Sequence, residues 1–112
     1  MKKKQKTATI TFKVDLDINN VPEDITWEAT DSQEKDNKAK AVIVSVWDAS
    51  AQTSFKIDLW TKEMMAEEMK FFIIQILDSL SDTYKKSVGD DKIAMEIKKF
   101  TKRIGKMSNV LK

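Results

Sequence analysis

The sequence predicts an α+β fold, in which a four-stranded antiparallel sheet is followed by two C-terminal helices packed on one face. Two patterns lead to this prediction. Along the first half of the chain apolar residues alternate with polar ones, as in half-buried strands, and after Trp60 they recur every three or four residues, as in amphipathic helices. Because all the strands precede both helices, we expect an antiparallel sheet with the helices on one side.

Four segments have the composition expected of strands: residues 9–18, 25–30, 39–47 and 54–60. In the third segment both alternate sets of positions are apolar, and one set is formed by Val42, Val44 and Val46. Continuing the alternation into the fourth segment places Trp60 with these valines, on the side opposite Leu59. One helix pair cannot easily cover both sides of a sheet, so this second side is predicted to bind a partner or another subunit.

Two helices are predicted from the spacing of the apolar residues. The first helix has a stripe that starts at Met65 and runs to about Val88, with Thr61 as a candidate N-cap. Gly89 suits the left-handed position after its last turn, and Asp90 or Asp91 suits the cap of a second helix that runs to about Met107. We therefore expect a single domain over residues 9–109, preceded by a basic, flexible N-terminus over residues 1–8.

The composition removes several classes of function. The chain of 112 residues contains neither histidine nor cysteine, so the commonest general base and the commonest metal ligands are missing, and we expect no enzyme and no cofactor. A net charge of +2 and a single arginine, Arg103, argue against a nucleic-acid partner. The longest apolar run, "FFIIQIL", is too short to span a membrane, and the expected location is cytoplasmic.

One motif resembles a metal-binding loop but lacks two of the residues that such a loop requires. "DLDINN" begins like a calcium-binding loop, but Asn20 stands where such a loop needs glycine and Thr26 where it needs a bidentate glutamate. The alternating acids are explained as the solvent face of a strand. Enzymatic chemistry with Asp and Lys side chains remains only as an unsupported alternative.

The joint between the last strand and the first helix, "IDLWTKEM", is the predicted working surface. Trp60 falls in phase with the charged residues Lys56 and Asp58, and an aromatic side chain on a polar face has the character of an interface anchor. The alternative is that Trp60 turns into the core, as the last residue of a strand often does. The candidate interaction residues are Trp60, Asp58, Lys62, Asp48, Val42, Val44 and Val46.

Three stretches of the chain, "NVPEDITWEATD", "VSVWD" and "KIDLWTKEMMAEEM", resemble the GldC family of gliding-motility-associated proteins of Bacteroidetes. This resemblance implies a non-enzymatic accessory component of the gliding machinery, which is linked to type IX secretion. It implies protein partners in motility or the envelope, and a location in the cytoplasm or at the periphery of the inner membrane. A homo-oligomer is a further expectation.

A second function class stays open at this point. The order of four strands followed by two helices resembles that of the export chaperone SecB, so a peptide-holding chaperone or an export-associated adaptor is the alternative. A chaperone would bind many unfolded chains through an open apolar surface, whereas an accessory component would bind one or two partners.

Overall fold

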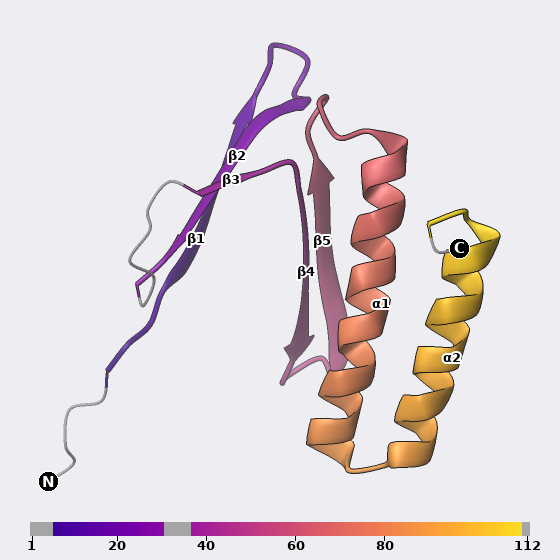
Figure 1. Ribbon diagram of the computed structural model, residues 1–112. Coiled ribbons are helices and arrows are strands. Elements are labelled where there is room, and N and C mark those ends of the chain that lie inside the picture. The colour runs from indigo at the N-terminus through magenta and orange to yellow at the C-terminus, as the bar shows by residue number, and fades with distance from the viewer. Residues whose placement is uncertain (1–5, 31–36, 111–112) are drawn as a thin grey trace, which may run out of the picture. The chain divides into compact units, whose positions relative to one another are not determined.

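The computed structural model describes residues 6–30 and 37–110, which form five strands and two helices (Figure 1). The elements in chain order are β1 (Ile10–Leu16), β2 (Pro22–Ala29), β3 (Asn37–Ala39), β4 (Ala41–Asp48), β5 (Thr53–Trp60), α1 (Ala66–Val88) and α2 (Asp91–Met107). The chain divides into two compact units, Met1–Met64 with the strands and Met65–Lys112 with the helices. Most of the predicted N-terminal segment 1–8 lies outside the described residues.

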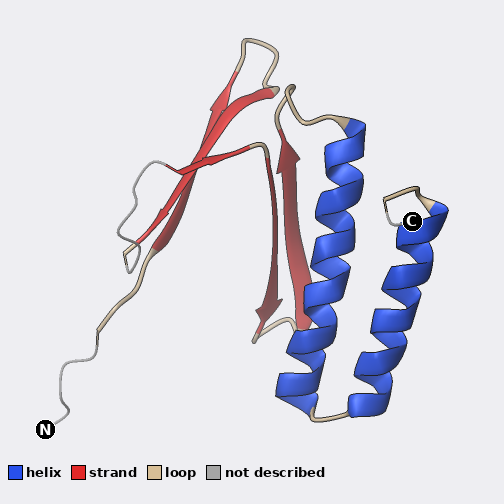
Figure 2. Ribbon diagram, in the orientation of Figure 1, coloured by secondary structure: helices blue, strands red, loops and turns tan. Residues whose placement is uncertain are grey.

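The α+β class, the antiparallel strands and the two C-terminal helices are confirmed, but the prediction of one four-stranded sheet is wrong. The strands form two sheets, one in the order β1-β2-β3 and one of β4 and β5 (Figure 2). The cause lies in the segment read as one strand over residues 39–47. The chain bends at Lys40, so the residues before the bend pair with β2 and those after it pair with β5.

The three-stranded sheet has one apolar and one polar face, as the alternation predicts. Phe12 lies opposite Trp27 and Val14 opposite Ile25, and Ile25 is completely buried. β2 begins three residues earlier than predicted, at Pro22, where the missing N–H is tolerated because it is the first position of the strand. The sheet unit therefore has its core around the middle of β2.

Helix α1 begins later than its predicted cap. Its N-cap is Met65, and the Glu68 carboxylate accepts a hydrogen bond from the Met65 N–H at 3.1 Å. Thr61, the predicted cap, is instead buried and continues the pairing of β4 with β5: its N–H and its hydroxyl both donate to the Lys40 carbonyl, at 2.8 and 3.2 Å. The helix could not start at Thr61 because the backbone there is still bonded to the neighbouring strand.

The turn between the helices follows the prediction. Gly89 ends α1 with φ of 80°, a left-handed conformation that glycine adopts without strain. Asp90 caps α2 by accepting hydrogen bonds from the N–H groups of Lys92 and Ile93. These two residues fix a tight antiparallel helical hairpin.

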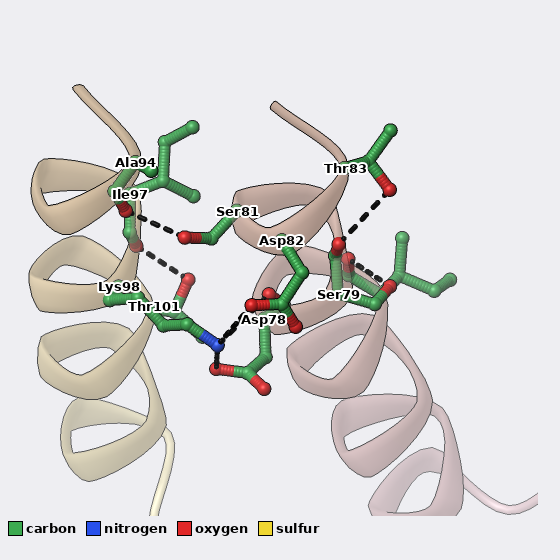
Figure 3. Close-up of polar contacts among 10 residues, drawn as sticks. Asp78, Ser79, Ser81, Asp82, Thr83, Ala94, Ile97, Lys98 and Thr101 are labelled. Carbon is green, nitrogen blue, oxygen red and sulfur yellow. Dashed lines mark hydrogen bonds and ion pairs between the residues drawn. The ribbon is translucent and has the colours of Figure 1, made fainter. Parts of the chain in front are cut away.

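The two helices of this hairpin meet along a seam of mostly small side chains. The buried residues of the seam are Ile74 and Ser81 on α1 and Ala94, Thr101 and Gly105 on α2. The Ser81 hydroxyl donates to the Ala94 carbonyl at 2.6 Å across the seam (Figure 3). Small residues let two helix backbones approach closely, so this seam joins α1 to α2.

Candidate interaction surfaces

The β4–β5 hairpin has an apolar face, and the residues that form it differ from those predicted from the sequence. Val42 lies opposite Leu59, Val44 opposite Ile57 and Val46 opposite Phe55, so all six side chains share one face. The valines were predicted to lie opposite the Leu59 side and together with Trp60, and the register contradicts this. Alternation along a single strand is reliable, but it cannot be carried across a turn without knowing the pairing.

This valine face, defined as Val42, Val44, Val46, Phe55, Ile57 and Leu59, is open toward the hairpin turn. Val46, Phe55 and Ile57 are 55%, 57% and 59% exposed, whereas the residues nearer the open end of the hairpin are half-buried. Exposed apolar side chains that are contiguous on one face mark a docking surface more often than scattered ones do.

The opposite face of the hairpin holds two tryptophans. Trp60 lies opposite Ala41 at the open end and Trp47 opposite Ser54 near the turn, and their side chains are 55% and 67% exposed. Between them Lys56 and Asp58 form an ion pair at 3.1 Å. We call Trp47, Trp60, Lys56 and Asp58 the tryptophan face. The sequence analysis identified Trp60 and Asp58 but not Trp47, because the placement of Trp47 relative to Trp60 depends on the register.

Asp48 belongs to neither face. Its carboxylate accepts a hydrogen bond from the Ala51 N–H at 2.7 Å, and its carbonyl accepts one from the Gln52 N–H at 2.9 Å. Gln52 adopts a left-handed φ of 50°, which this turn requires. Asp48 therefore builds the turn between β4 and β5, at the end of the hairpin away from Trp60.

Lys62 is held in an ion pair with the turn between β1 and β2. Its ammonium lies 2.6 Å from a carboxylate oxygen of Asp17 and 3.8 Å from Glu23. The other carboxylate oxygen of Asp17 accepts hydrogen bonds from the N–H groups of Asn19 and Val21, at 2.7 and 3.0 Å. The acid that begins the imperfect calcium-like motif thus organises a turn and anchors the segment after β5.

These contacts shift the pKa values of Asp17 and Lys62 in the directions that favour their charged forms. The Lys62 ammonium and the backbone N–H groups lower the pKa of Asp17 from 3.8 to about 2, and Asp17 raises the pKa of Lys62. Because the folded pKa of Asp17 is the lower one, its stabilising effect is complete above the unfolded pKa of 3.8 and is lost as the pH falls toward about 2.

We expect the Asp17 carboxyl to titrate near pH 2 when it is followed by carbon NMR of the side chain. In the variant Lys62→Met its pKa should rise but stay below 3.8, because the hydrogen bonds from Asn19 and Val21 remain. A pKa near 3.8 in the unmodified protein would show that the ion pair does not form in solution.

The helical hairpin has a charged cluster on one side. The Lys98 ammonium lies 3.0 Å from Asp78 and 3.3 Å from Asp82, and it points from α2 toward both acids on α1 (Figure 3). A cavity of about 370 Å³ beside it is lined by Ile74, Gln75, Asp78, Lys98, Thr101 and Lys102. Asp78 and Asp82 raise the pKa of Lys98, so this amine stays protonated and cannot serve as a nucleophile or a general base near neutral pH.

The apolar stripes of the helices lie about a quarter of a turn (α2) to a third of a turn (α1) from the seam, since successive residues are separated by about 100° around a helix. Several of their side chains are exposed, among them Leu80 on α1 and Ile93 and Phe100 on α2. The guanidinium of Arg103 stacks over the Phe100 ring at 5.4 Å. Other stripe residues, among them Phe72, Ile76 and Ile97, are half-buried.

Within the described ranges no group of three acidic residues is placed to bind a metal ion. Neither of the two described helices is long and apolar enough to cross a membrane. The seven predicted interaction residues thus lie in four places: the valine face, the tryptophan face, the β4–β5 turn and the ion pair of Lys62.

The chain matches a known protein family. The family model described as "Gliding motility-associated protein GldC-like" matches residues 22–110, which include every predicted interaction residue. No curated protein and no solved structure matches the chain.

Proposed function

Because the chain belongs to the GldC-like family of gliding motility-associated proteins, we propose that it is a non-enzymatic accessory component that binds other proteins of the motility machinery. The observation that carries this proposal is the tryptophan face. Two tryptophans more than half exposed on one side of a short hairpin are unusual for a surface without a partner, because Trp is among the residues most enriched at the centres of interfaces.

The chemistry of this face favours a protein partner of mixed polarity. Trp60 and Trp47 offer large apolar areas, each with one N–H donor, and the ion pair of Lys56 and Asp58 lies between them. Such a surface can place aromatic anchors in pockets of the partner while the charges set orientation. Asp48 and Lys62 support the surface indirectly, by fixing the two ends of the segment that carries it.

The proposal includes a cellular location and a secretion system. We place the protein in the cytoplasm or at the periphery of the inner membrane, in association with type IX secretion, as the family resemblance implies. The peptide-holding chaperone has no support from the family match, and we keep it only as an outcome of the experiment below.

We expect a photo-cross-linking amino acid at Ser45 to give a small number of discrete adducts in native cells. Ser45 lies opposite Lys56, on the tryptophan face, and its side chain is exposed. The matched control is the same amino acid at Val46, which is exposed on the opposite face and should give a different pattern. Adducts should be identified by mass spectrometry in cytoplasmic and membrane fractions.

Trp60→Ala should reduce the Ser45 adducts about tenfold or more, since loss of a Trp at an interface hot spot costs about 2 kcal/mol or more of binding. Its folding should be checked by circular dichroism, so that loss of a partner is not confused with loss of structure. Adducts that are unchanged in Trp60→Ala would overturn the assignment of this face. A broad set of unfolded clients at both positions would favour the chaperone instead.

A further inference from the structure

β1 is an edge strand whose outer side has no strand partner among the described residues. It pairs only with β2 in the order β1-β2-β3. The Thr30 N–H donates to the Thr9 carbonyl at 3.0 Å, so the backbone groups of Thr9 face β2. Since this direction alternates along an antiparallel strand, the N–H and C=O groups of Ile10, Phe12, Val14 and Leu16 point outward.

This edge lacks most of the features, such as proline or a bulge, that prevent edge strands from pairing with other chains. It contains no proline, and its bulge lies on the β2 side, where Asp15 pairs with Asp24 but Leu16 pairs with Pro22. Three apolar side chains of the strand, Ile10, Phe12 and Leu16, are 65%, 43% and 51% exposed. A second strand added at this edge would find both unpaired backbone groups and apolar side chains to cover.

The charged side chains of β1 indicate which strand could pair with it. Lys13 and Asp15 project from the polar face, and no ion pair within the described part of the chain involves either of them. We propose that β1 pairs antiparallel with β1 of a second copy of this chain, with Val14 opposite Val14 on the two-fold axis. Lys13 then lies opposite Asp15 of the second copy, and the symmetry repeats this pair on the other side of the axis.

The apolar face fits the same register. Phe12 lies opposite Leu16 of the second copy, and the outward N–H and C=O of Val14 form a hydrogen-bonded pair with their symmetry equivalents. The two three-stranded sheets become one continuous sheet. The proposal does not depend on the proposed function, because β1 precedes residues 22–110, where the family model matches.

Neighbouring registers are excluded by charge. A two-fold axis through Lys13 sets two lysines opposite each other, and an axis through Asp15 does the same with two aspartates; like charges directly opposite are destabilising. An axis through Phe12 leaves Lys13 opposite Thr11, with no ion pair. An axis through Asp15 also brings Lys13 opposite Asp17, but Asp17 is already paired with Lys62 at 2.6 Å. Only the register centred on Val14 forms two pairs of opposite charge without setting like charges opposite each other.

The edge of β5 has a similar pattern and provides the control. Lys56 and Asp58 are spaced like Lys13 and Asp15, but they are already paired with each other within β5, at 3.1 Å. Reversing one of these charges should therefore leave the association of two copies unchanged.

The test is sedimentation velocity of the full chain over a range of concentrations. We expect the unmodified protein to reach twice its monomer mass of 12.9 kDa. Lys13→Asp and Asp15→Lys should each weaken the dimer about tenfold or more, because both cross-strand pairs become repulsive. An equimolar mixture of the two variants should recover the dimer, since every pair in the mixed dimer is again of opposite charge. This recovery also shows that both variants fold.

A cysteine scan fixes the register independently, because the natural chain has no cysteine. Val14→Cys should form a disulfide between copies on mild oxidation, since directly opposite residues in a hydrogen-bonded pair have Cα atoms about 5.5 Å apart. Phe12→Cys should not, because its nearest equivalent lies several residues away along the strand. Trapping at Phe12 but not at Val14 would overturn the register.

The other outcomes overturn the dimer itself. A mass of 12.9 kDa at every concentration would exclude self-association. Dimerisation that is lost in Lys56→Asp and Asp58→Lys and regained in their mixture, but is unaffected by changes at Lys13 and Asp15, would place the contact on β5.

Discussion

Ile25→Ala should lower the free energy of unfolding by about 2–5 kcal/mol, the range for large apolar residues truncated in a core. Ile25 is the only apolar residue with a side chain completely buried in the described part of the sheet unit. It lies between Val14 on β1 and Ala39 on β3, so its loss leaves a cavity in the middle of the sheet.

The measurement is urea unfolding followed by two probes. All three tryptophans, Trp27, Trp47 and Trp60, lie in the sheet unit, whereas ellipticity at 222 nm reports mainly α1 and α2. If residues 9–109 fold as the single domain that we propose from the sequence, Ile25→Ala shifts both transitions together. Two transitions at different urea concentrations would show instead that the two units unfold independently.

Ile57→Ala is the matched control, because Ile57 is 59% exposed in β5. It should cost well under about 1 kcal/mol, as surface substitutions do. Equal losses in Ile25→Ala and Ile57→Ala would show that the valine face is covered in solution to the same extent as the centre of β2.

Strands, helices and turns could be predicted from the sequence where neighbouring residues determine them. Alternation located β1 and β5, the three and four spacing located both helices, and Gly89 and Asp90 marked the turn between them. These signals act within a few residues, so no knowledge of the rest of the fold is needed. The bend at Lys40 has no such signal, because it is neither glycine nor proline, and the division into two sheets was therefore missed.

The candidate surfaces also could be predicted only within a single strand. Trp60 and Asp58 were identified because they lie on one strand, where alternation fixes the face. The relation of Trp60 to Trp47, and of Val44 to Ile57, depends on the register, which the turn built by Asp48 sets. Side chains used for local structure, such as those of Asp48 and Lys62, resemble binding residues in a sequence because both are polar.

The seam between the helices could not be predicted from hydrophobic periodicity. Ser81 and Ala94 are almost completely buried, and neither has the long apolar side chain that a periodicity search favours. Close approach of two helices requires small side chains, so the contact lies where hydrophobicity is low.

Ala94→Leu should lower the free energy of unfolding by about 1–3 kcal/mol, because a larger side chain overpacks a buried contact between the helices. Ala94 is 4% exposed, and its carbonyl accepts the hydrogen bond from the Ser81 hydroxyl at 2.6 Å. A leucine there would push α2 away from α1 and stretch this bond. The measurement is urea unfolding followed at 222 nm, where both helices contribute.

Met95→Leu is the control one residue away. Met95 is 56% exposed, so the same leucine should change the stability by less than about 0.5 kcal/mol. Ser81→Ala separates the hydrogen bond from the packing: it removes the bond without adding volume and should cost about 0.5–1.5 kcal/mol. If Ala94→Leu were as stable as Met95→Leu, the helices would not meet at Ala94, and the apolar stripes would have to form the contact instead.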